Sequence, residues 1–83
     1  MANDLELFKK ELGKKIAYFR VQKGLTQTQL AALLNKDFQS LSRIENGRVN
    51  PSGYLLFQIT EALQISMNDL FYQSGTAPQS NKA

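Results

Sequence analysis

The sequence predicts an all-α fold, and three observations lead to that prediction. Apolar residues recur at steps of three and four along most of the chain, which is the period of a helix with one buried face. Residues that commonly cap helices stand between these segments. No stretch alternates apolar and polar residues with the period of two expected of a half-buried strand. The 83 residues form one domain, near the lower size limit for a core without metal or disulfide.

The first expected helix runs from about Asp4 to Gln22. Lysine and glutamate residues separate its apolar residues, which are spaced so that they share one face that we expect to be buried. These residues are Leu5, Phe8, Leu12, Ile16 and Phe19. Gly24 then ends the helix, because glycine adopts positive φ without a steric cost.

The second expected helix begins after Thr26. Thr26 and Gln29 have the spacing of a capping box, in which the threonine hydroxyl accepts from the glutamine backbone amide and the glutamine side chain reaches back. Leu30, Ala31, Leu33 and Leu34 follow. Asn35 tolerates the left-handed conformation and can end this helix.

Asp37 is a second capping residue, and it starts a third helix that runs from Phe38 to about Asn46. Gly47 ends this helix. One face carries the residues expected to point into the core. They are Leu41, Ile44 and Glu45.

A fourth helix starts at Pro51 and Ser52, with Ser52 as its cap and an inward stripe of Leu56, Ile59, Thr60 and Leu63. Ser66 and Asp69 cap a short fifth helix. From Gln73 the chain is polar and without period, so we expect a domain over residues 1–72 and a disordered tail over residues 73–83.

The composition excludes several kinds of function. The chain has no cysteine and no histidine, which removes disulfides, thiolate metal sites and the commonest general base. We therefore expect no metal, no cofactor and no enzymatic activity. The N-terminus is acidic where a signal peptide would be basic, and no apolar run approaches the roughly 18 residues of a membrane span. These features predict a cytoplasmic protein that is not associated with a membrane.

Positive charge is concentrated in the first half of the chain. Residues 9–48 contain nine basic and three acidic residues, whereas the whole chain has a net charge of +3. A polyanion is expected to bind this half. A solvated lysine-rich helix face explains the same charge equally well, so charge alone does not decide between them.

The second and third expected helices are joined by only a few residues, and the second of the pair exposes polar side chains, as in a helix-turn-helix. Several short segments around them stand in one order without a gap. They are Gly24-Leu25-Thr26-Gln27, Gln29-Leu30-Ala31, Leu41-Ser42-Arg43-Ile44-Glu45-Asn46-Gly47, Asn50-Pro51-Ser52 and Glu61-Ala62-Leu63 through Asp69-Leu70-Phe71. Over roughly Leu12 to Phe71 the sequence therefore resembles the Cro and phage-repressor (Xre-type) helix-turn-helix family. This resemblance implies a compact five-helix lambda-repressor-like DNA-binding domain, with the third helix in the major groove of double-stranded DNA.

The resemblance also implies roles for individual residues. The base-facing positions of the recognition helix are Phe38, Gln39, Ser42 and Arg43. The positions that contact DNA phosphates are Gln27, Asn46, Gly47 through its amide, and Arg48. Arg20 and Glu45 match a buried ion pair that ties the first helix to the third.

Each role has a simpler alternative. Arg43 suits the O6 and N7 atoms of guanine and Gln39 the N6 and N7 atoms of adenine, but both could be ordinary surface residues. Phe38 either covers a thymine methyl or packs onto the turn at 35–37, where the family favours Gly, an apolar residue and Ser. Ser42 could simply face solvent. Gln27 could be only a first-turn helix residue, and Arg20 and Glu45 could be independent surface charges.

Two questions about partners follow. Tyr54, Leu55 and Phe57 lie off the inward stripe of the fourth helix and, with Leu70, Phe71 or Tyr72, could form an exposed patch that a second copy covers. The alternative is that they enlarge a small core. The expected function is that of a small transcriptional regulator, a repressor that binds double-stranded DNA as a homodimer. The alternative is an antitoxin or other protein-interaction module that binds a partner protein, such as a toxin, and its own operator.

Overall fold

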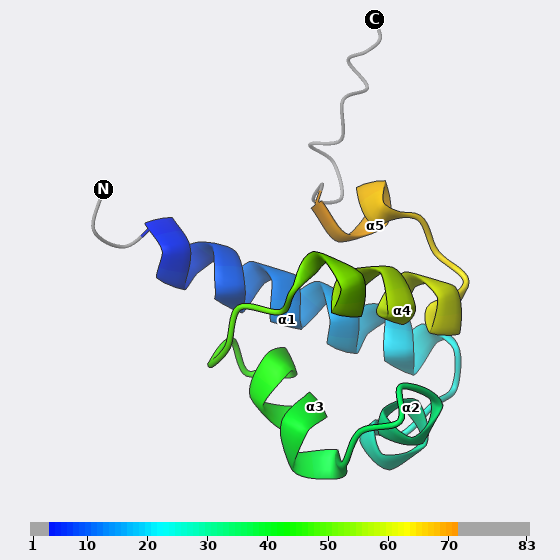
Figure 1. Cartoon of the computed structure of the whole chain (residues 1–83). Coiled ribbons are helices and arrows are strands. Elements are labelled where there is room, and N and C mark those ends of the chain that lie inside the picture. Colours follow the sequence, from blue (N-terminus) through cyan, green and yellow to red (C-terminus); the bar gives the residue numbers. More distant parts are fainter. Residues whose placement is uncertain (1–3, 72–83) are drawn as a thin grey trace, which may run out of the picture.

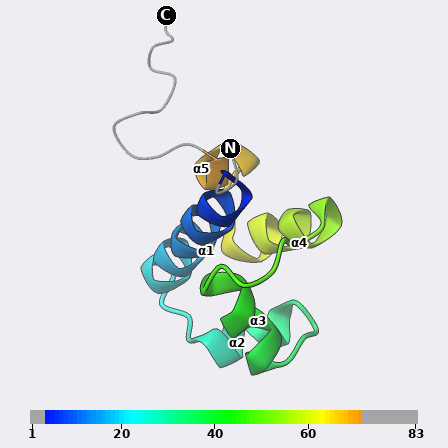
Figure 2. The same cartoon turned by 90° about the vertical axis from the view of Figure 1, so that its left-hand side faces the viewer.

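Five α-helices make up the part of the chain that the computed structural model describes, residues 4–71. They are α1 (Asp4–Gln22), α2 (Gln27–Leu33), α3 (Phe38–Glu45), α4 (Gly53–Leu63) and α5 (Met67–Phe71). The helices α2 and α3 lie on one side of α1 and α4, and α5 lies on the opposite side (Figures 1 and 2). The predicted all-α, five-helix fold is confirmed. None of these five helices is both long and apolar enough to cross a membrane.

All five helices contribute to a single hydrophobic core. Its centre is formed by Ile16, Leu30, Leu41, Ile59 and Leu63, whose side chains have almost no exposed surface. The predicted inward stripe of α4 is buried along its whole length. Helix α3 packs against α1 and α2, and because α2 and α3 each bury one apolar face in this core, their opposite faces are left to solvent.

The helix ends follow the capping residues that the sequence predicts. Thr26 and Gln29 form both hydrogen bonds of the capping box, at 2.9 and 3.0 Å, and Asp37 accepts from the Ser40 amide at 2.8 Å. Asn35 has the predicted positive φ, at 60°. We did not predict that Gln64 also has positive φ, at 58°, where it ends α4. The third helix ends one residue earlier than predicted, with Asn46 as its C-cap.

Close backbone contact fixes α3 against α1. A Cβ atom on Gly13 of α1 would overlap the backbone carbonyl oxygens of Ile44 and Glu45. A Cβ atom on Gly47, which has a φ of 74°, would lie 2.8 Å from the Cα atom of Lys10. These two glycines therefore let the C-terminal end of α3 approach the α1 backbone.

The prediction of one continuous buried face on α1 is wrong for its first turns. Leu5 is 51% exposed and Phe8 is 41% exposed, whereas the face is buried at Leu12 and Ile16. The reason is that the other helices cover α1 fully only from about its third turn onwards. Phe8 instead stacks on Phe71 of α5, with ring centroids 6.0 Å apart.

Candidate nucleic-acid interface

The outward face of α3 carries most of the side chains predicted to face DNA bases. Gln39 and Arg43 are exposed, and Phe38 is 48% exposed. Leu41 and Ile44 are buried on the opposite face. An amide and a guanidinium group are thus presented to solvent on a helix whose other face is held by the core.

Ser42 and Asn46 bond to each other in this structure. The Asn46 side-chain amide donates to the Ser42 hydroxyl at 3.3 Å, one helical turn apart. Ser42 is half-buried, whereas Asn46 is exposed. Ser42 is therefore the least accessible of the four predicted base-facing residues.

Gly47 and Arg48, which follow α3, differ in their exposure to solvent. Gly47 is buried, and its amide donates to the carbonyl oxygen of Ile44 at 3.1 Å. This donor helps to end α3, and the contact of the amide with a phosphate stays a prediction. Arg48 is exposed, so its side chain remains available to a DNA phosphate.

Arg20 and Glu45 form an ion pair between α1 and α3. The Arg20 Nε atom donates to Glu45 Oε2 at 2.8 Å, and Nη2 donates to Oε1 at 3.2 Å. The side chains are only 14% and 4% exposed. They are therefore not independent surface charges. Arg20 Nη1 also donates to the Leu25 carbonyl oxygen at 2.8 Å, which attaches the loop after α1.

Gln27 has a contact that the sequence did not reveal. Its side-chain Nε2 atom donates to Glu45 Oε1 at 2.8 Å, although the two residues are 18 positions apart. The buried Glu45 carboxylate thus bonds to side chains of both α1 and α2. Gln27 is half-buried, so part of this residue remains at the surface.

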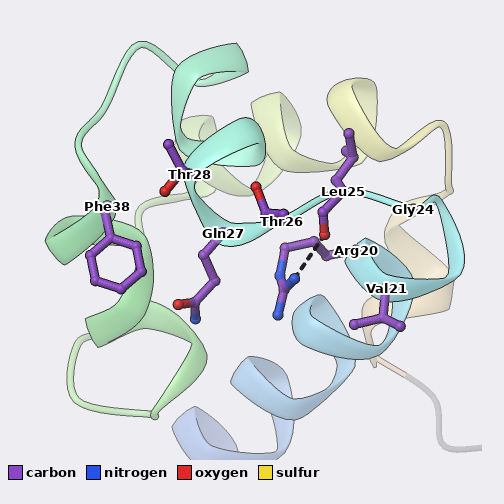
Figure 3. Close-up of a pocket in the computed structure, with 8 residues that line it drawn as sticks. All are labelled: Arg20, Val21, Gly24, Leu25, Thr26, Gln27, Thr28 and Phe38. Atoms are coloured by element: carbon purple, nitrogen blue, oxygen red, sulfur yellow. Dashed lines mark hydrogen bonds between the residues drawn. The ribbon is translucent and has the colours of Figure 1, made fainter.

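A hollow of about 470 Å³, open to solvent, lies in front of Gln27 (Figure 3). It is lined by Arg20 and Val21 of α1, by residues 24–28, and by Phe38 of α3. Phe38 is 48% exposed beside this hollow, so about half of its surface is accessible. Both alternatives for Phe38, contact with a thymine methyl and packing onto the turn, therefore stay predictions.

Asp37 places a stable negative charge at the start of α3. Hydrogen bonding from the Ser40 amide lowers the pKa of the Asp37 carboxyl below its usual value, and the positive charge of Arg43 lowers it further. Asp37 is therefore ionised at neutral pH. Its role as a cap was predicted, but its electrostatic effect together with Arg43 was not.

The predicted patch for a second copy is only partly exposed. Tyr54 is 70% and Phe57 is 52% exposed, and their rings stack with centroids 6.5 Å apart. Leu55 was also assigned to the patch, but it is half-buried and packs against the core, because it lies on the flank of α4 next to the buried stripe. Leu70 is likewise buried, at 2% exposure. Tyr72 and the tail predicted over 73–83 lie outside the described residues.

Comparison with known proteins gives consistent matches. A family model described as "Helix-turn-helix" matches residues 16–70. An uncharacterised HTH-type transcriptional regulator of Sinorhizobium fredii is 34% identical over 70 residues, which are 84% of this chain and 91% of that protein. Among solved structures, the restriction-modification controller protein C.AhdI from Aeromonas hydrophila is similar with a TM-score of 0.77 and 29% identity, over 82% of this chain and 99% of that chain. The clp gene regulator ClgR from C. glutamicum is similar with a TM-score of 0.74 and 33% identity, over 76% of this chain and 81% of that chain.

Proposed function

This chain belongs to the helix-turn-helix family of DNA-binding transcription regulators, and we propose that it acts as a repressor that inserts α3 into the major groove. The observation that carries the proposal is the outward face of α3, where Gln39 and Arg43 are exposed while the opposite face is buried. A repressor of this kind works in the cytoplasm by occupying its operator.

Gln39 and Arg43 are the proposed readers of base edges. A glutamine amide can pair with the N6 and N7 atoms of adenine, and an arginine can pair with the O6 and N7 atoms of guanine. Phe38 contributes apolar contact with a thymine methyl group. Ser42 has a smaller part, because it is half-buried and accepts a hydrogen bond from Asn46.

Phosphate contacts hold α3 in position in this proposal. Gln27 stands at the start of α2 beside the hollow, and Arg48 is exposed just after α3. Such contacts set the orientation of a protein on DNA and carry no base preference. Asn46 makes a further phosphate contact when its side-chain amide donates to a phosphate oxygen in place of the Ser42 hydroxyl.

We test the base readers by selecting bound duplexes from a random DNA pool and then measuring the variants Gln39→Ala and Arg43→Ala. Each variant is expected to lose about 1–3 kcal/mol of binding free energy and to relax the preference at one position. Asn68→Ala, at an exposed site on α5, is the matched control and is expected to bind like the unchanged protein. A protein that selects no sequence at any salt concentration would contradict the proposal.

The proposed repressor is a homodimer. One recognition helix reads only a few base pairs, and two copies can bind half-sites about 34 Å apart. The exposed and stacked rings of Tyr54 and Phe57 offer apolar surface on α4 that a second copy can cover. Phe8 and Phe71 add a second stacked and partly exposed pair.

Light scattering at micromolar protein concentration tests the dimer. We expect the mass of two chains for the unchanged protein and the mass of one chain for Phe57→Ser, because the substitution removes apolar area from the proposed contact. Leu33→Ser is the control, since Leu33 is also exposed, at 61%, but lies on α2. A single-chain mass for the unchanged protein, with and without DNA, would refute the dimer.

A further inference from the structure

One exposed negative charge stands alone on the basic half of the chain. The basic segment 9–48 contains three acidic residues. Two of them form ion pairs, which are Glu11–Lys14 at 3.9 Å and Glu45–Arg20 at 2.8 Å. The third is Asp37, which is exposed and forms no ion pair within the described part of the chain. Its carboxylate therefore opposes the attraction of this half for a polyanion.

Local hydrogen bonding holds the Asp37 carboxylate at the start of α3. Asp37 is the N-cap of this helix, and its Oδ1 atom accepts from the Ser40 amide at 2.8 Å. This hydrogen bond and the positive charge of Arg43 lower the pKa of the carboxyl, so the group is ionised at neutral pH. Backbone amides at the start of a helix otherwise favour the binding of a phosphate. At the start of α3 one of these amides is already bonded to an anion of the chain itself.

The position of Asp37 relative to the base readers decides when its charge is close to DNA phosphates. Asp37 directly precedes Phe38 and Gln39, which are both exposed. In the proposed function the first residues of α3 face base edges on the floor of the major groove. The groove is about 12 Å wide, and the phosphates line its edges. Asp37 is therefore closest to phosphates when α3 is not seated on that floor.

We infer that Asp37 is a specificity-determining residue, whose carboxylate repels backbone phosphates when α3 lies on DNA that lacks the selected site. Nonspecific complexes depend almost entirely on phosphate contacts, so a negative charge at the start of α3 weakens them more than it weakens the specific complex. Repulsion of the wrong partner contributes to specificity in the same way as attraction of the right one. The inference rests on the proposed function, because it concerns how the same recognition helix rejects other sequences.

Asp37→Asn tests the inference, because asparagine caps a helix about as well as aspartate but carries no charge. Affinities are measured at about 50 mM salt for two duplexes, one with the selected site and one without it. The variant is expected to bind the duplex without the site about threefold more tightly, which is the effect of removing one repulsion between unit charges in water. The affinity for the selected site is expected to stay unchanged.

Asp69→Asn is the matched control. Asp69 is also exposed, and its Oδ2 atom accepts from the Ser66 amide at the start of α5, at 2.8 Å. The substitution changes the net charge by the same amount, but α5 lies on the opposite side of the molecule from α3 (Figure 1). Because screening weakens interactions with distant phosphates, this variant is expected to gain far less affinity for the duplex without the site.

Three outcomes would overturn the inference. The first is an Asp37→Asn protein that binds the duplex without the site no more tightly than the unchanged protein or the Asp69→Asn control. The second is an equal gain in affinity for both duplexes. The third is a loss of affinity for the selected site with a relaxed preference at one base pair, which would make Asp37 a base reader. Circular dichroism at the temperature of the binding assay verifies that each variant is folded.

The base readers show which proposal has failed. If Asp37→Asn leaves the ratio of the two affinities unchanged while Gln39→Ala and Arg43→Ala still relax the sequence preference, only the further inference is lost. If the unchanged protein selects no sequence, the proposed function is refuted and the inference with it.

Discussion

Removing the positive charge of the α1–α3 ion pair should strongly destabilise the fold. Arg20→Ala deletes two hydrogen bonds to Glu45 and one to the Leu25 carbonyl oxygen. The Glu45 carboxylate then stays buried with only the neutral amide of Gln27 as a partner. The cost is therefore that of leaving a buried charge uncompensated, in addition to the lost contacts.

The burial of the pair sets the expected magnitude. At side-chain exposures of 14% and 4%, the loss belongs to the class of buried pairs, for which removing one partner costs about 3–5 kcal/mol. An exposed pair contributes only about 0–1 kcal/mol. For a domain of this size the larger loss lowers the melting temperature by roughly 20 °C.

Thermal unfolding followed by circular dichroism measures the effect. Lys14→Ala is the control, because the Lys14–Glu11 pair is 3.9 Å long with side chains 74% and 36% exposed, and the expected change in melting temperature is only a few degrees. The double variant Arg20→Leu/Glu45→Met should recover most of the stability lost in Arg20→Ala, since it leaves no buried charge. An Arg20→Ala protein that keeps its melting temperature would refute this reasoning.

Three further predictions concern other parts of the domain. Gly13→Ala should lower the free energy of unfolding, measured with denaturant, by about 1–3 kcal/mol, because the added Cβ would overlap backbone carbonyls at the end of α3. This cost exceeds the gain from the better helix propensity of alanine. Gly53→Ala is the control, since a Cβ there has open space and should be neutral or stabilising. Because the pKa of Asp37 is lowered in the folded state, its carboxylate stabilises the fold at neutral pH, and this stabilisation is lost as the pH falls through the folded-state pKa. Below about pH 4 the melting temperature of Asp37→Asn should therefore fall less steeply than that of the unchanged protein. Equal slopes for the two proteins would contradict this. Arg48→Ala should weaken binding to all sequences alike and reduce the slope of log affinity against log salt concentration by about one. A change in base preference instead would contradict the phosphate contact.

Local sequence was sufficient to predict the helices and most of their ends. The capping pair of Thr26 and Gln29 and the cap at Asp37 connect residues only three positions apart, so their hydrogen bonds form wherever the helix starts. The buried stripe of α4 follows from the helical period alone. The end of α4 was missed, because Gln64 is not a residue type that usually signals positive φ.

Tertiary structure alone decided how the site is assembled. The bond between Gln27 and Glu45 joins residues 18 positions apart, and it depends on how α2 and α3 pack together. The packing of the other helices likewise leaves Leu55 only half-buried and Leu5 exposed, and it uses the Gly47 amide inside the fold. A periodic pattern shows which residues share a helix face, but the angle and distance at which helices cross determine what that face contacts. The sequence therefore predicted which residues form the recognition helix, whereas it did not predict the arrangement of side chains that supports this helix.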